Sequence, residues 1–69
     1  MQRARIISCG TELTLGQTVD TNAAWLARRL AALGLRTEQI CVVPDSTEAL
    51  RDAILSAAQA SDVVLISGG

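Results

Sequence analysis

The 69-residue sequence contains no histidine, lysine, tyrosine or phenylalanine, and these absences exclude several kinds of chemistry within it. Without histidine and lysine it has no Ser-His-Asp triad, histidine-ligated zinc, Schiff base or Walker-A lysine. A net charge of −1 and a single aromatic residue leave neither a basic stripe for phosphate backbones nor a platform for stacked bases. We therefore expect no nucleic-acid partner, and any general base must be aspartate or glutamate.

Long apolar runs and a cysteine framework are also missing. Near the N-terminus only Ile6 and Ile7 precede the polar Ser8, which is too short for a signal peptide, and no run approaches the roughly 20 apolar residues of a membrane span. The two cysteines, Cys9 and Cys41, lie far apart inside apolar runs, which favours buried, reduced thiols. We expect a cytoplasmic protein without a membrane partner.

The chain does have enough apolar residues for a core, with 49% hydrophobic residues, a mean hydropathy of +0.33 and only 19% charged residues. Apolar runs predict strands at about 4–9, 35–43 and 62–67, and helical periodicity predicts helices at about 21–33 and 47–60. Strands and helices that alternate with short connections predict an α/β fold with a parallel sheet in the order 2-1-3.

Each predicted helix has an apolar face and a start signal. The first helix should begin at a cap formed by Asp20 or Thr21, stop at Gly34 and bury one stripe, formed by Ala23, Leu26, Ala27, Leu30 and Leu33. Trp25 lies off that stripe, in register with Arg29, either to cover its edge or to meet a partner. The second helix should follow capping oxygens of Asp45, Ser46 and Thr47. Its buried stripe should comprise Leu50, Ile54, Ala57 and Ala58, backed by Leu55.

Three segments should converge at the carboxyl edge of this sheet, where open α/β sheets bind ligands. They are Gly10 to Gly16, Pro44-Asp45-Ser46 and Ser67-Gly68-Gly69. The first fits neither the G-x-G-x-x-G pattern nor a P-loop, so it is either an ordinary turn or a ligand-binding loop. Asp45 is either a helix cap or a site residue; beside a phosphate it would require a divalent cation. Asp20 and Asn22 are caps first and site residues second.

Several of these segments together resemble a known family. They are Ile6-Ile7-Ser8-Cys9-Gly10-Thr11-Glu12-Leu13, Leu15-Gly16-Gln17, Asp20-Thr21-Asn22, Val43-Pro44-Asp45 and Leu65-Ile66-Ser67-Gly68-Gly69. In this order they look like the start of a MoaB/Mog-type, molybdopterin-binding-like domain. Within that superfamily they are most similar to the competence/damage-inducible protein CinA family.

The resemblance implies a three-layer α/β/α fold, of which 1–69 would be the βαβαβ N-terminal half, an incomplete part of a single domain. It also implies a homo-oligomer and, in CinA-type proteins, metal-dependent hydrolysis of ADP-ribose, often beside a nicotinamide-mononucleotide deamidase domain. The molybdenum-cofactor relatives instead bind molybdopterin, so the expected ligand is a small nucleotide or a pterin. An inactive α/β fragment is the third alternative.

Site residues follow from the same resemblance, position by position. Asp45 matches an acidic residue with a catalytic role, and the ligand-binding positions are Gly10, Thr11, Glu12, Gly16, Asn22, Ser67, Gly68 and Gly69. Thr11 is typical of CinA-like members, whereas metal-inserting relatives tend to carry aspartate there. The family's loop continues after the paired glycines into a Gly-Pro-Thr and paired-Asp stretch that lies beyond Gly69, so the residues that would hold a divalent metal ion are not identified by the sequence.

Overall fold

A three-stranded parallel sheet forms the centre of the computed structural model, which describes residues 2–17 and 19–68. The strands are β1 (Gln2–Cys9), β2 (Leu35–Val43) and β3 (Val63–Gly68), arranged in the order β2-β1-β3. This order confirms the prediction. β1 is hydrogen-bonded on both sides, so its residues form the middle of the sheet and its end lies between the ends of the other two strands.

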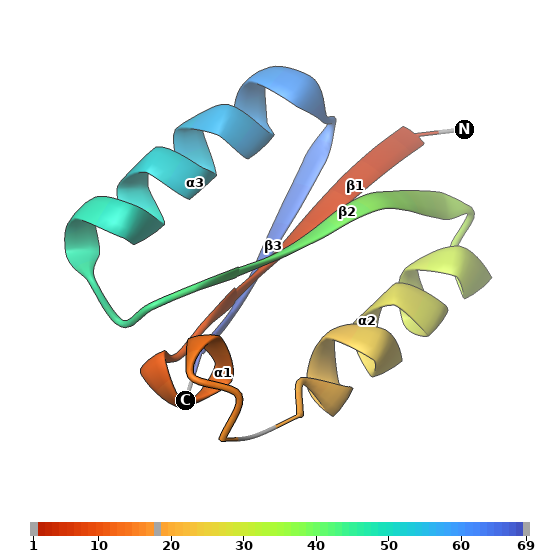
Figure 1. The fold of residues 1–69 in the computed structure, drawn as a ribbon. Coiled ribbons are helices and arrows are strands. Elements are labelled where there is room, and N and C mark those ends of the chain that lie inside the picture. Colours follow the sequence, from red (N-terminus) through yellow and green to blue (C-terminus); the bar gives the residue numbers. More distant parts are fainter. Residues whose placement is uncertain (1, 18, 69) are drawn as a thin grey trace.

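Two helices cover opposite faces of the sheet and give the predicted three-layer α/β/α architecture (Figure 1). Helix α2 (Thr21–Ala32) packs on the face that carries Ala4 and Ile6, and helix α3 (Thr47–Ala60) packs on the face that carries Ile7. Neighbouring residues of a strand point to opposite faces, which is why Ile6 and Ile7 belong to different cores. Both side chains are buried.

The helix ends follow the capping chemistry in the sequence. Asp20 accepts the Ala23 N–H at 3.2 Å and begins α2, and Gly34, with a φ of 85°, follows its end. Ser46 begins α3 by accepting the Ala49 N–H at 3.4 Å. Asp45 was one of the three residues predicted to supply capping oxygens. It precedes the capping residue Ser46, and its carboxylate does not cap the helix.

Some predicted core positions were wrong. Leu33 lies one residue beyond α2 and is 76% exposed, and Leu55 and Ala58 on α3 are also exposed. Three strands present too narrow a surface to cover every apolar residue of a helix. For the same reason β3 is an edge strand whose Ile66 is half exposed, and Cys9 and Cys41 are half-buried free thiols.

The loop predicted between β1 and the first long helix contains a short helix, α1 (Thr11–Thr14), that the sequence pattern did not indicate. It lies directly at the carboxyl end of β1 (Figure 1). Gly16 closes it with a φ of 74°, a conformation that a side chain would strain. Among residues 2–17 and 19–68, no helix is long and apolar enough to cross a membrane.

Candidate functional site

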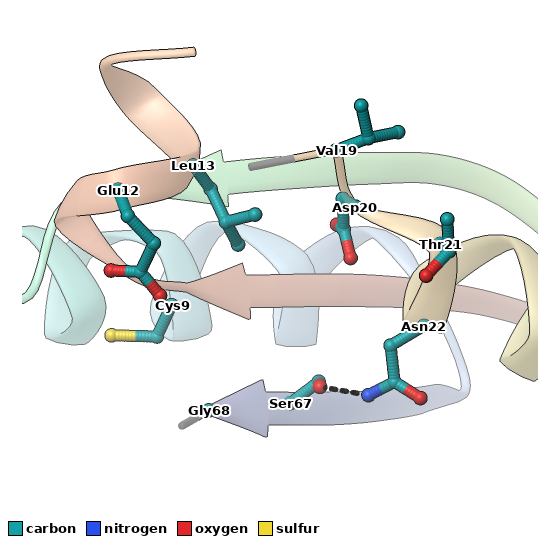
Figure 2. A pocket seen from close by; sticks show the side chains of 9 residues that line it. All are labelled: Cys9, Glu12, Leu13, Val19, Asp20, Thr21, Asn22, Ser67 and Gly68. Carbon is teal, nitrogen blue, oxygen red and sulfur yellow. Dashed lines mark hydrogen bonds between the residues drawn. The ribbon is translucent and has the colours of Figure 1, made fainter. Parts of the chain in front are cut away.

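The site begins with the turn from β1 into α1, where a glycine leaves room for a carboxylate. A Cβ atom added at the buried Gly10 would lie 2.7 Å from Glu12 Oε1, inside van der Waals contact. The φ of Gly10 is 171°, which any residue adopts, so a side chain here would not strain the backbone but would displace the Glu12 carboxylate. Figure 2 shows the Glu12 side chain reaching back over the end of β1 toward Cys9.

Three contacts join this turn to the segment that follows β2. The Gly10 N–H donates to Val43 O at 3.0 Å, and the Asp45 N–H donates to Thr11 Oγ1 at 3.2 Å. The Cys9 thiol lies 3.7 Å from Pro44 O, as a weak hydrogen bond. Through these contacts the two loops that carry Glu12 and Asp45 are held side by side.

Glu12 and Asp45 line the same small hollow. Its volume is about 140 Å³, and Cys9, Gly10 and Gly68 complete its wall. The three strand ends of the sheet thus each contribute, because Cys9 ends β1, Asp45 follows β2 and Gly68 ends β3. Two acidic residues thus line the hollow, and no arginine is among its lining residues in the described part of the chain.

A second, larger hollow of about 240 Å³ adjoins the first and shares Cys9, Glu12 and Gly68 with it. Its other lining residues come from α1, from the segment before α2, from the first turn of α2 and from the end of β3, and they are Leu13, Val19, Asp20, Thr21, Asn22 and Ser67 (Figure 2). The lining is a mixture of polar and apolar side chains without a cation. The three shared residues make the two hollows adjoining parts of one surface region at the strand ends.

Hydrogen bonding in the larger hollow ties α2 to β3. Asn22 Nδ2 donates to Ser67 Oγ at 2.6 Å, and this bond is drawn in Figure 2. Asp20 uses Oδ1 to cap α2, whereas its Oδ2 atom is buried with no hydrogen-bond partner among the described residues. A buried carboxylate oxygen without a donor is costly, so a ligand N–H or O–H that reached it would find a favourable acceptor.

Most of the residues predicted for the site lie together. Gly10, Glu12 and Asp45 line the smaller hollow, Asn22 and Ser67 line the larger one, and Gly68 lines both. Thr11 and Gly16 line neither hollow, and Gly69 lies outside the described residues. Their roles in ligand binding stay predictions.

Other lining residues were not among the predicted site residues. Leu13, Val19 and Thr21 line the larger hollow, and Val19 is 81% exposed. An apolar residue in an irregular segment carries no recognisable motif, so only the exposure of Val19 in the structure reveals it. Cys9 also lines both hollows. Its place at the end of the central strand is the sequence feature that indicates a position beside the site.

The acidic residues of the smaller hollow do not by themselves complete a metal site. Among residues 2–17 and 19–68, no three histidine, cysteine, aspartate or glutamate side chains are close enough to form a complete protein site. Magnesium commonly keeps several waters and binds one or two carboxylates plus substrate phosphates. Glu12 and Asp45 supply that number of carboxylates in one hollow.

Comparison with known proteins identifies the family. Residues 5–69 match the family described as "Probable molybdopterin binding domain". The chain belongs to this family. Its domain is 45% identical over 67 residues to a CinA-like protein from Akkermansia muciniphila, covering 97% of this chain and 16% of that protein. A relative from Alkaliphilus oremlandii, whose name describes it as competence-damage inducible, is 46% identical over 67 residues, with the same coverage.

The domain also has a solved structural relative. The crystal structure of CinA from Thermoplasma acidophilum, a protein whose function its title gives as unknown, matches with a TM-score of 0.94 and 34% identity, covering 97% of this chain and 40% of that one. These matches confirm the resemblance to the CinA family and the fold. The chain spans only 16% of the length of the CinA-like relative from Akkermansia.

Proposed function

We propose that this domain supplies part of the active site of a CinA-like hydrolase that cleaves the pyrophosphate of ADP-ribose with a divalent metal ion. The observation that carries the proposal is the smaller hollow, in which Glu12 and Asp45 face a common space at the carboxyl ends of all three strands. Parallel α/β sheets bind their ligands at that edge.

The charges of the hollow support a metal-dependent reaction. A pyrophosphate group is anionic, and two carboxylates without a neighbouring arginine would repel it. Glu12 and Asp45 would hold a divalent cation between themselves and the phosphate oxygens. When bound, this ion supplies the positive charge that neutralises the pyrophosphate and the developing charge of the leaving phosphate.

Asp45 is the residue to which we assign the chemistry. Because Ser46 caps α3, the Asp45 carboxylate is free to orient a water molecule and accept its proton. The water oxygen forms a bond to one phosphorus atom while the bond from that phosphorus to the bridging oxygen breaks, and AMP and ribose 5-phosphate leave. No histidine or lysine exists in the chain to take this role.

The larger hollow suits the part of the ligand that carries hydrogen-bond donors. The free Asp20 Oδ2 accepts a hydroxyl or amino group, and the Asn22–Ser67 pair offers further polar atoms beside it. The ribose hydroxyls of ADP-ribose have this chemistry. We also propose that the full-length protein is a homo-oligomer, as the family resemblance implies.

A molybdopterin-binding role is the second candidate, and the description of the matching family favours it. A pterin ring carries N–H donors that would also fit Asp20 Oδ2, and the molybdopterin phosphate, like a pyrophosphate, would need a cation beside Glu12 and Asp45. The two candidates differ in a simple observation. A pterin-binding protein purifies with a fluorescent pterin or takes one up and leaves ADP-ribose intact.

The experiment that tests the proposal is an ADP-ribose hydrolysis assay on the full-length protein, with magnesium or manganese and with a chelator. We expect release of AMP and ribose 5-phosphate only when the metal is present. Release that is equal in the chelator would contradict the metal role. No release under either condition, together with a bound pterin, would transfer the assignment to the second candidate.

A further inference from the structure

The Thr11 hydroxyl is directed toward the backbone of the neighbouring loop. Its Oγ1 atom accepts the Asp45 N–H at 3.2 Å, and Thr11 is absent from the lining of both hollows. The residue is therefore next to the candidate site without facing it. A threonine hydroxyl that accepts a backbone N–H fixes the position of that peptide group.

The backbone of Thr11 is itself held firmly. Its carbonyl oxygen accepts the Thr14 hydroxyl at 2.9 Å and the Leu15 N–H at 3.0 Å, which are both contacts within the turn of α1. The preceding Gly10 donates its N–H to Val43 O at 3.0 Å. The backbone of Thr11 is thus held in place, and its side-chain hydroxyl forms one hydrogen bond with the Asp45 N–H.

Asp45 belongs to the short connection between β2 and α3. It lies between the end of β2 at Val43 and the helix cap at Ser46, and its peptide N–H is bonded to Thr11 across the site. Thr11 also directly precedes Glu12. The Gly10–Val43 and Cys9–Pro44 contacts hold the two chain segments side by side, and the Thr11 hydroxyl is the contact that reaches Asp45 itself.

We infer that Thr11 is a positioning residue that holds Asp45 at the working distance from Glu12, and not a ligand contact. The inference rests on the proposed function for the meaning of that distance, but the hydrogen bond can be tested without any activity. A small displacement of a reacting group lowers the rate of a reaction far more than it lowers affinity. Loss of the bond should therefore reduce kcat and leave KM unchanged.

The first test measures amide hydrogen exchange of Asp45 by NMR on the isotope-labelled protein. Thr11→Val keeps the shape and removes the acceptor, whereas Thr11→Ser keeps the hydroxyl. The expected exchange rate of the Asp45 amide rises about fivefold in Thr11→Val, the factor that corresponds to a net hydrogen bond of about 1 kcal/mol. Thr11→Ser should keep the rate of the parent protein.

Thr47→Val is the matched control, because Thr47 is an exposed threonine two positions after Asp45 that lines neither hollow. It should leave the Asp45 exchange rate unchanged. An unchanged rate in Thr11→Val, or an equal rise in Thr47→Val, would overturn the inference. If Thr11→Val lowers the stability of the whole protein, the amides of β1 will also exchange faster, so their rates distinguish global unfolding from loss of the Asp45 hydrogen bond.

The second test measures hydrolysis by the full-length protein. We expect kcat to fall about fivefold in Thr11→Val at unchanged KM, and to recover in Thr11→Ser. A raised KM with unchanged Asp45 exchange would make Thr11 a ligand contact and overturn the inference. Faster Asp45 exchange in a protein that hydrolyses no ADP-ribose would support the positioning role and refute the proposed function, so the two failures are distinguishable.

Discussion

At the scale of single residues, Asp45 is important because the neighbouring Ser46, and not Asp45, caps helix α3. Ser46 caps α3, so the Asp45 carboxylate can serve the hollow that it shares with Glu12. Removing its charge should therefore affect chemistry more than folding. This separation makes Asp45 the most informative position for mutation.

Asp45→Asn should lower the rate of ADP-ribose hydrolysis by about 100-fold, because an amide cannot accept the proton of the attacking water. The melting temperature should stay close to that of the parent protein. Steady-state kinetics and a thermal melt on the full-length protein measure both quantities.

Asp52→Asn is the matched control, since Asp52 is an exposed aspartate on α3 that lies outside both hollows. It should retain full activity. Equal losses in the two variants, or an unaffected rate in Asp45→Asn, would remove Asp45 from the mechanism.

Gly10 is the second informative residue, because the space left by its missing side chain is occupied by the Glu12 carboxylate. A methyl group at this position would meet Glu12 Oε1 and push the carboxylate into another rotamer. Gly10→Ala should therefore weaken manganese binding by roughly fivefold, which corresponds to about 1 kcal/mol of rotamer strain. Isothermal titration of the protein with Mn²⁺ measures the change.

The double variant gives the control for this mechanism. In a Glu12→Ala background the carboxylate is gone, so Gly10→Ala should cause no further loss of manganese affinity. If Gly10→Ala costs as much in that background as in the parent protein, its effect does not pass through Glu12.

At the scale of elements, the start of α3 shows which of two possible capping residues, Asp45 or Ser46, caps the helix. Both Asp45 and Ser46 are good capping residues. In the structure Ser46 is the cap, and the Asp45 backbone N–H instead donates a hydrogen bond to Thr11. That bond comes from a segment far away in the sequence. Local pattern therefore predicts the helix but leaves its capping residue open.

Ser46→Ala should destabilise the protein by about 1 kcal/mol through loss of the cap. Asp45→Ala should cost less than about 0.5 kcal/mol, the size of a modest interaction with the helix dipole. Urea denaturation of both variants compares the free energies of unfolding. A larger loss for Asp45→Ala than for Ser46→Ala would show that Asp45 is the true cap.

Helix α1 shows where sequence patterns stop being informative. Thr11–Thr14 is too short to have an apolar periodicity, and the glycines near it indicate a turn. Its position matters because it directs Glu12 and Leu13 toward the hollows. The long helices and the strands, in contrast, were predictable within one or two residues because their apolar patterns continue over many positions.

At the scale of the whole molecule, the sheet order decided most of the site. Once β1 lies between β2 and β3, the carboxyl ends of all three strands must meet, so Gly10, Asp45 and Gly68 line one hollow. The predicted order of three strands already makes β3 an edge strand, but it does not say which apolar side chains so narrow a sheet leaves exposed. The exposure of Leu33, Leu55 and Ile66 follows from that width and not from their own sequence patterns.

The central strand should dominate stability. Ile7 is 1% exposed in the core beneath α3, and Ile66 on the edge strand is 51% exposed. Ile7→Ala should therefore cost about 3 kcal/mol of unfolding free energy, a large share of what a domain of this size has. The same substitution at Ile66 should cost less than about 1 kcal/mol. Similar costs in denaturant titrations would contradict the packing described for the sheet.

The central proposal is that Glu12 and Asp45 form a metal-assisted site for a pyrophosphate. The most direct test is ADP-ribose turnover by the full-length parent protein and its Asp45→Asn variant, each with magnesium and with a chelator. We predict turnover only when magnesium is present, at a rate about 100-fold lower for the variant than for the parent protein. Turnover in the chelator, or equal rates for the two proteins, would contradict the claim.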